Sequence, residues 1–451
     1  MSDRRFEVVL REVARLGGGE AELYVARSRA RGYEAREGRL DTIAFSDTLA
    51  LGLRLFRGDR MGFSYGFAGD DADLARMTRE AAFCLESSDP DEAYGLPDTG
   101  PLAGDAFSGA PGPALCDPAW ESVAEEEKGE FARSLEAAVL ARDPRMKRVR
   151  TAALRDAVAE VSLRNSRGVS LERRETRCFA HVETVAEDGG EGQTGYGFGF
   201  ARSLRGLSAA AISAEGADRA LRMLGAARPK TGAYRMVIEN GAAADLLDVL
   251  CPSFLAPQVA KGKSMLAGKV GAAVASGAVS VADDPLDPRA SGAEPFDGEG
   301  TPARRRELVA GGVLRGYLAD AFWGRKIGTG TTGACRRPGA KQPPSVGPSN
   351  LCLSPGTLSF DALLAAAGEG ILLTEFLGIH TADPVSGDFS VGASGLRIAG
   401  GALAEPLHGF AVSGNILDLL REVESAGSDF RWFGSTGSPS LLVSRVAVGG
   451  D

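Results

Sequence analysis

The chain has 451 residues, 44% of them hydrophobic and 25% charged, which is typical of a globular protein with two or three domains of roughly 100–200 residues each. Its net charge of −9 argues against nucleic acid as the main partner, because phosphate binding needs a basic face. No run approaches about 18 apolar residues, so no membrane span is expected. The charged start predicts no export signal, and the six scattered cysteines favour a cytoplasmic protein with reduced thiols.

The first part of the sequence repeats an order of strands followed by a helix. A helical stripe from Arg5 to Leu16 precedes the strand patterns LALGLRLF and MGFSYGFA. Asp70 or Asp71 is expected to cap the next helix, and residues 89–118 form a long surface excursion rich in proline and glycine.

The same order then returns. A helix is expected from Glu121 to Arg142, followed by a hairpin whose turn is NSRG, and a helix near Ala214–Leu224 ends this part. The pattern predicts an N-terminal α+β domain over residues 1–228 and suggests a duplicated strand-and-helix unit, although no residue-level repeat is visible.

The second part is richer in strands. It opens with the strand YRMVIE and the candidate helix NGAAADLLDVLCPSFLAPQV. Hairpin turns are expected at Gly311-Gly312 and Gly400-Gly401, and the helix NILDLLREVESAG precedes a last strand, SLLVSRVAV. We therefore expect a C-terminal domain over residues 229–451 built mainly on a large antiparallel sheet, and an α+β class overall.

Several common motifs are absent or incomplete. GTGTTG matches the spelling of a dinucleotide fingerprint, but the prolines after it exclude the helix that would face a pyrophosphate. AKGKS lacks the leading glycine of a phosphate loop. The three histidines are too far apart for two to ligate a metal from one helix, and no G-x-S-x-G elbow is present. The acidic stretches VADDP and FDGEG lack calcium-loop spacing and favour solvated turns.

A series of motifs in order nevertheless resembles one family. GKSMLAGKVG, VSVADDP, PFDGEGTPARRRELVAGGVLRGYLAD, GTTGACRR and GILLTEFLGIHTADPVSGDFSVGASGLRIAGG resemble the TldD/PmbA family, also known for modulators of DNA gyrase. LRNSRGVSLERRET and MGFSYGFA extend the resemblance into the first part of the chain. It implies the two-domain fold of that family and a role in proteolysis.

The resemblance also implies which branch the chain belongs to. TldD-type subunits carry H-E-x-x-x-H on the helix after the first strand of the C-terminal part, with a cysteine near the chain end as a further ligand. The corresponding helix here, NGAAADLLDVLCPSFLAPQV, has no His and no Glu, and no cysteine follows Cys352. The chain therefore resembles the TldE (PmbA) branch, and we expect no metal, no cofactor and no catalytic residue of its own.

The resemblance implies a non-catalytic subunit of a cytoplasmic heteromeric metallopeptidase, with a TldD-type subunit and a peptide as partners and a homodimer when alone. The alternatives are a self-assembling peptide-binding protein without a protease partner and a cryptic hydrolase that uses Asp297, Glu299 or His380. We expect Asp297, Glu299 and Thr301 to line a peptide chamber. The alternative is a structural role, in which Asp297 or Glu299 pairs with Arg304 or Arg305.

Overall fold

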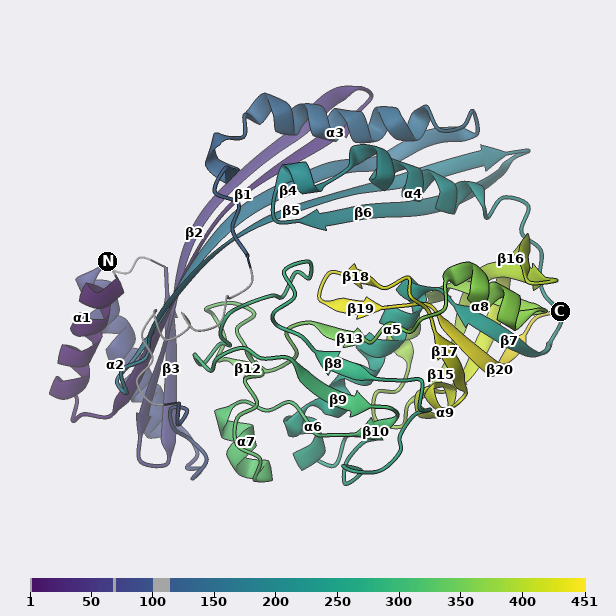
Figure 1. Cartoon of the computed structure of the whole chain (residues 1–451). Coiled ribbons are helices and arrows are strands. Elements are labelled where there is room, and N and C mark those ends of the chain that lie inside the picture. Colours follow the sequence, from purple (N-terminus) through teal and green to yellow (C-terminus); the bar gives the residue numbers. More distant parts are fainter. Residues whose placement is uncertain (1, 68–69, 100–113) are drawn as a thin grey trace.

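The computed structural model describes residues 2–67, 70–99 and 114–451 (Figure 1). The middle of the predicted excursion, residues 100–113, lies outside the described residues. None of the described helices is both long and apolar enough to cross a membrane.

In the described residues, the N-terminal half forms one long antiparallel sheet with four α-helices. Its strands, in the spatial order β3-β2-β1-β4-β5-β6, are β1 (Glu20–Arg36), β2 (Arg39–Arg57), β3 (Arg60–Gly66), β4 (Met146–Asn165), β5 (Ser170–Asp188) and β6 (Glu191–Ala201). The helices are α1 (Ser2–Arg15), α2 (Asp71–Ser87), α3 (Glu125–Leu140) and α4 (Ala209–Leu221). The order α1-β1-β2-β3-α2 is thus repeated as α3-β4-β5-β6-α4. The two units meet where β1 pairs with β4, and β3 and β6 form the two edges.

Glycines let a helix lie directly on each edge strand. A Cβ atom at Gly62 of β3 would lie 1.9 Å from the carbonyl oxygen of Ala81 in α2. On the other edge, a Cβ atom at Gly195 would lie 2.1 Å from the carbonyl oxygen of Gly216, and one at Gly197 would lie 2.1 Å from that of Ile212. Only glycine allows backbones to approach this closely, so these positions fix α2 on β3 and α4 on β6.

The C-terminal half confirms the α+β class but divides its strands between sheets. One six-stranded sheet has the order β10-β9-β8-β13-β19-β18, and the other has the order β16-β15-β14-β7-β20-β17. The single large antiparallel sheet that the sequence predicts is thus replaced by two six-stranded sheets. These sheets are also not wholly antiparallel, because β13 pairs with β19, and β7 with β14, in parallel. The strands are β7 (Gly232–Ile238), β8 (Val281–Asp283), β9 (Arg306–Ala310), β10 (Val313–Leu314), β11 (Cys335–Arg336), β12 (Ser345–Val346), β13 (Leu351–Leu353), β14 (Gly370–Leu377), β15 (Asp388–Ala399), β16 (Ala402–Asn415), β17 (Val423–Ala426), β18 (Arg431–Phe433), β19 (Thr436–Ser438) and β20 (Leu441–Gly449).

The helices of this half are short. They are α5 (Asn240–Leu250), α6 (Ala256–Ala260), α7 (Ala321–Ile327), α8 (Phe360–Ala367) and α9 (Ile416–Arg421). The stretch predicted as one helix from Asn240 is interrupted at Pro252 and Pro257, because proline cannot donate a backbone hydrogen bond within a helix. One face of α5 is buried in the main core between the two sheets. The predicted boundary at residues 228 and 229 falls between α4 and β7 and stays a prediction.

Local turn predictions are confirmed. Gly311 and Gly312 have φ angles of +54° and +77°, and Val309 pairs with Leu314 across them, as a type I′ hairpin requires. Gly400 and Gly401 form the same kind of turn between β15 and β16. Asp70 caps α2 by accepting a hydrogen bond from the Asp73 backbone N–H.

Candidate functional site

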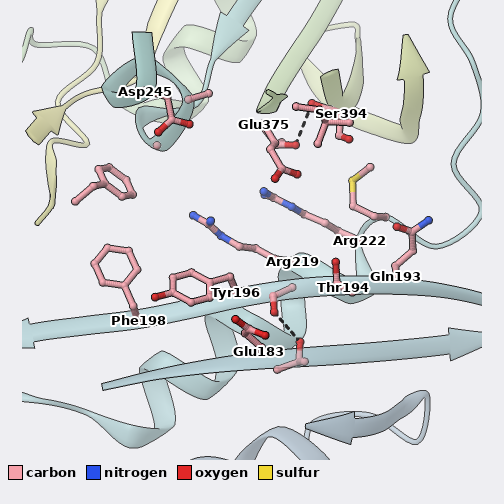
Figure 2. Close-up of a pocket in the computed structure, with 18 of the residues that line it drawn as sticks. Glu183, Gln193, Thr194, Tyr196, Phe198, Arg219, Arg222, Asp245, Glu375 and Ser394 are labelled. Atoms are coloured by element: carbon pink, nitrogen blue, oxygen red, sulfur yellow. Dashed lines mark hydrogen bonds between the residues drawn. The ribbon is translucent and has the colours of Figure 1, made fainter. Parts of the chain in front are cut away.

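A cavity of about 760 Å³ lies between the two halves of the chain (Figure 2). Its N-terminal side comes from β4, β5, β6 and the end of α4, and its C-terminal side comes from α5, β14, β15, β16, β18 and the turn after β18. Its lining residues include Phe179, Glu183, Gln193, Thr194, Tyr196, Phe198, Arg219, Arg222, Gly241, Ala242, Asp245, Thr374, Glu375, Ser394, His408 and Phe433.

The edge strand β6 runs along this cavity with its backbone partly free. The Phe198 N–H donates to Glu215, and the Phe198 carbonyl accepts from Arg431, so the backbone groups of Phe198 point away from β5. Because this direction alternates along an antiparallel strand, the N–H and C=O groups of Thr194 and Tyr196 also point away from β5. Among the described residues no strand pairs with β6 on that side. The cavity therefore contains a short stretch of open sheet edge that ends at Phe198.

Aromatic side chains form one wall of the cavity. The ring of Phe198 lies 6.1 Å from that of Phe179, 6.0 Å from that of Tyr196 and 5.8 Å from that of Phe433, measured between centroids. The guanidinium of Arg431 lies 4.4 Å from the Phe198 ring centre. This wall offers apolar contact area beside the free backbone groups.

Acidic side chains lie on the opposite wall. Figure 2 shows Asp245 of α5 and Glu375 of β14 across the cavity from β6. Partial burial, together with the negative charges of Asp248 and Glu375, raises the pKa of Asp245 to about 6. The pair accumulates negative charge at neutral pH, which favours a cationic group in the cavity.

Two of the three arginines that line the cavity, Arg219 and Arg222, are bonded to other carboxylates. Arg222 forms two hydrogen bonds with Glu239, at 3.1 and 3.0 Å, and Arg219 pairs with Glu215 at 3.1 Å. They therefore leave the acidic wall uncompensated by a direct ion pair in the part of the chain that the structure describes.

Ser394 and His408 also meet at the cavity. The Ser394 hydroxyl lies 3.0 Å from Nδ1 of His408, and the two residues face each other across β15 and β16. This is a cross-strand hydrogen bond at a β-bulge, and it holds the imidazole at the rim of the cavity.

The residues predicted to line a chamber lie elsewhere. Asp297 and Glu299 are 2% and 1% exposed, and neither they nor Thr301 line this cavity. Asp297 accepts hydrogen bonds from the backbone N–H groups of Glu299, Thr301 and Cys335, at 2.9, 2.8 and 3.1 Å. Burial and the nearby charge of Glu299 raise the pKa of Asp297 to about 7. This geometry favours a structural role, and the chamber assignment of the three residues stays a prediction.

The ionic partner of Glu299 was not foreseen. Glu299 accepts hydrogen bonds from Arg54 of β2 and from the Ala321 N–H, both at 2.9 Å, while Arg54 also donates two bonds of 2.8 Å to Glu22. The expected pairing with Arg304 or Arg305 is wrong, because Arg305 lies 3.4 Å from Asp284 instead. Although burial opposes it, Arg337 and Arg54 hold the pKa of Glu22 below its usual value. This cluster ties the two halves together.

The cavity residues were also missed by sequence reasoning. A signal for them existed in GYGFGF of β6, where glycines and aromatic residues alternate. One face of this strand lies under α4, and the other presents Tyr196 and Phe198 to the cavity. His380, in the one-turn helix Ile379–Thr381, has no hydrogen bond or ion pair to Asp297 or Glu299 among the described residues.

The fold is that of a two-part α+β protein. The N-terminal half is a long sheet with repeated helices, the C-terminal half contains two sheets, and the cavity lies between the halves. Three family models match consecutive parts of it: PmbA/TldA metallopeptidase domain 1 over residues 21–84, the central domain over 118–224 and the C-terminal domain over 231–450. The chain belongs to the PmbA/TldD metallopeptidase family.

Individual relatives agree with this membership. The chain is 24% identical to the metalloprotease PmbA of Escherichia coli O157:H7 over 432 residues, which are 96% of this chain and 92% of that one. It is also 24% identical to a metalloprotease TldD homolog of Haemophilus influenzae over 455 residues, covering 95% and 92%.

Solved structures show the same fold. A Thermotoga maritima protein described as a proposed modulator of DNA gyrase matches with a TM-score of 0.89 and 25% identity over 100% of both chains. TldE from Thermococcus kodakarensis matches with a TM-score of 0.87 and 21% identity over 99% of this chain and 100% of that one.

The cleft of this chain does not fit the metal that the family name implies. Among the described residues, no group of three or more His, Cys, Asp or Glu side chains is placed to hold a metal ion. The part of α5 that faces the cavity presents Gly241, Ala242 and Asp245, of which only Asp245 has a donor side chain. His408 is engaged with Ser394 through Nδ1. No step of a reaction is therefore assigned to a metal here.

Proposed function

We propose that this chain is the non-catalytic, TldE/PmbA-type subunit of a cytoplasmic heteromeric metallopeptidase that acts on small or unfolded peptides with a TldD-type partner. One observation carries the proposal: α5 borders the cavity, as a metal-bearing helix of a peptidase would, but it presents only Gly241, Ala242 and Asp245 there. A cavity without a set of metal ligands among its described residues suits a subunit that binds or encloses a substrate for another chain.

Strand addition gives this cavity a way to hold an extended peptide. The free backbone groups of Thr194 and Tyr196 can pair with a peptide backbone regardless of its sequence. The aromatic wall then receives apolar side chains, and Asp245 with Glu375 receives basic ones. The groups that occupy the Phe198 backbone, Glu215 and Arg431, limit the pairing at one end.

The first test combines the purified chain with a TldD-type subunit from the same host. We expect no cleavage of an unstructured peptide by this chain alone, and cleavage by the mixture that chelators abolish. Equal rates with and without this chain would contradict a contribution to the reaction.

The second test addresses the strand edge. Thr194→Pro removes the outward N–H while proline remains tolerable on an edge strand, so peptide binding should weaken by about threefold to tenfold, the loss of one hydrogen bond. The matched control Thr194→Val keeps the N–H and should bind normally. Equal affinity of the proline and valine variants in a fluorescence anisotropy titration would refute the edge as the binding element.

The second candidate is a self-assembling peptide-binding protein without a protease partner. One observation favours it: the open edge of β6 lies beside an aromatic wall, and this pair of features can bind a peptide backbone without a group from another chain. Purification of the tagged protein from its host separates the candidates, because a TldD-type chain in stoichiometric amount supports the first and its absence supports the second.

A further inference from the structure

Arg306, the first residue of β9, is a half-buried arginine without a partner. Among the described residues from 20 to 451, every other arginine that is buried or half-buried forms a hydrogen bond or an ion pair, whereas Arg306 forms neither. Its guanidinium can donate five hydrogen bonds and stays charged at neutral pH. Removing such a group from water costs free energy unless a ligand supplies the acceptors.

The neighbouring arginines of the same run divide into paired and unpaired ones. Arg305 lies 3.4 Å from Asp284 and 3.9 Å from Glu307. Arg304 is exposed and, like Arg306, has no hydrogen bond or ion pair among the described residues. Burial and the charge of Arg304 lower the pKa of Arg306 to about 10. The two unpaired guanidinium groups therefore repel each other, and an anion bound between them would offset this repulsion.

A glycine of the GTGTTG stretch leaves room for the Arg306 guanidinium. Gly333 has a φ angle of +67°, and a Cβ atom there would lie 3.0 Å from Nη2 of Arg306. The same Cβ atom would lie 3.3 Å from the methyl group of Thr301, whose hydroxyl is buried without a hydrogen-bond partner. The fold thus brings the arginine run and the glycine-rich loop together, and two side chains next to Gly333 have unused hydrogen-bond donors.

Two carboxylates near Arg306 do not replace such an anion. Asp283 faces Arg306 across β8 and β9, but it is 1% exposed and accepts from the N–H groups of Ser349 and Asn350, both at 2.8 Å. Asp297 accepts the three backbone hydrogen bonds described above. The charges of both carboxylates favour the charged form of Arg306. In the part of the chain that the structure describes, neither forms an ion pair with it, so its donors stay free.

We infer that Arg304 and Arg306 bind a phosphate group, either as free inorganic phosphate or as the monoester of a small molecule. The two unpaired positive charges match the charge of about −2 that a phosphate monoester carries at neutral pH. A guanidinium can also donate two parallel hydrogen bonds to phosphate oxygens. Neither arginine lines the peptide cavity. The site is therefore separate from that cavity, and the inference does not depend on the proposed function.

The test is isothermal titration calorimetry of the full chain with inorganic phosphate, and separately with phenyl phosphate, at neutral pH and constant ionic strength. We expect saturable binding. Arg304→Gln and Arg306→Gln should each raise the dissociation constant by about tenfold or more, because each removes charged hydrogen bonds to the phosphate. The tighter of the two ligands identifies the source of the phosphate group.

The matched control is Arg305→Gln, which removes a positive charge from the same run but from an arginine that is paired with Asp284. This variant should bind phosphate as the unmodified chain does. Without phosphate, Arg304→Gln should raise the melting temperature of the chain, because it removes the repulsion on Arg306. A structural role of Arg304 would instead lower it. Because Arg304 is exposed, this variant tests the site even if Arg306→Gln does not fold.

Four outcomes would overturn the inference. They are no saturable binding of either phosphate, equal dissociation constants for the unmodified chain and all three variants, equally tight binding of acetate at the same ionic strength, and a melting temperature lowered by Arg304→Gln.

Discussion

At the scale of single residues, the chain contains two carboxylates with different consequences. Asp245 is ionisable at the wall of an open cavity, whereas Glu299 is enclosed and bonded to Arg54. The first affects how the protein responds to pH, and the second affects how well its halves hold together.

The Asp245 carboxyl should make the chain less stable as pH rises from about 4 to about 6. Burial and two neighbouring carboxylates raise its folded-state pKa from the usual 3.8 to about 6, so in this window the folded state binds more protons than the unfolded state. Asp245→Asn removes this contribution, so the free energy of unfolding of the variant should fall less between pH 4 and pH 6 than that of the unmodified chain. Urea unfolding at several pH values measures the slopes. The exposed Asp41→Asn is the control, and a slope unchanged by Asp245→Asn would contradict the assignment.

Glu299→Gln separates a structural role from a chamber role. Because the substitution weakens a buried, charged hydrogen bond to Arg54, we expect the free energy of unfolding to fall by about 1.5–3 kcal/mol. Thermal unfolding measures this loss, and the exposed Glu307→Gln is its control. Normal stability with lost peptide turnover in the heteromer would instead support the chamber role. If neither stability nor turnover changes, both roles are wrong.

At the scale of secondary-structure elements, the glycines under α2 and α4 are the main constraint. Gly197→Ala would place a methyl group 2.1 Å from the Ile212 carbonyl, so α4 must move away from β6. We expect a loss of about 1–3 kcal/mol in stability, and a weaker peptide affinity because the cavity wall shifts. Gly192→Ala, whose methyl would meet nothing closer than 3.8 Å, is the matched control in the same strand. Equal stability of the two variants in urea unfolding would show that the close contact between Gly197 and α4 does not determine the stability of the chain.

Elements also show which parts of the fold the sequence predicts. The Gly311-Gly312 hairpin and the Asp70 cap depend on neighbours within a few residues, so their local chemistry was sufficient. The bond between Arg54 and Glu299 joins residues 245 positions apart, and nothing in the local pattern around either residue indicates the other. The cavity could not be predicted for the same reason, because its walls come from both halves of the chain.

At the scale of the whole molecule, the acidic composition limits the choice of partners. With a net charge of −9, the chain should show no submicromolar affinity for duplex DNA at physiological salt, despite the gyrase-related description of a structural neighbour. Anisotropy titrations with a labelled duplex at two salt concentrations measure this. Tight binding that weakens steeply with salt would contradict the expectation.

The cluster of Glu22, Arg54, Glu299 and Arg337 has a consequence for biosynthesis. The double hydrogen bond from Arg54 to Glu22 spans 32 positions, so it can form soon after the first strands leave the ribosome. Glu299 follows Arg54 by 245 positions, a delay of roughly 10 to 50 s at ordinary bacterial and eukaryotic translation rates. During that interval Glu22 neutralises the arginine charge that the C-terminal half will later bury. In the nascent sheet, the charge of Arg54 is thus compensated by Glu22 until the C-terminal half is synthesised and covers it.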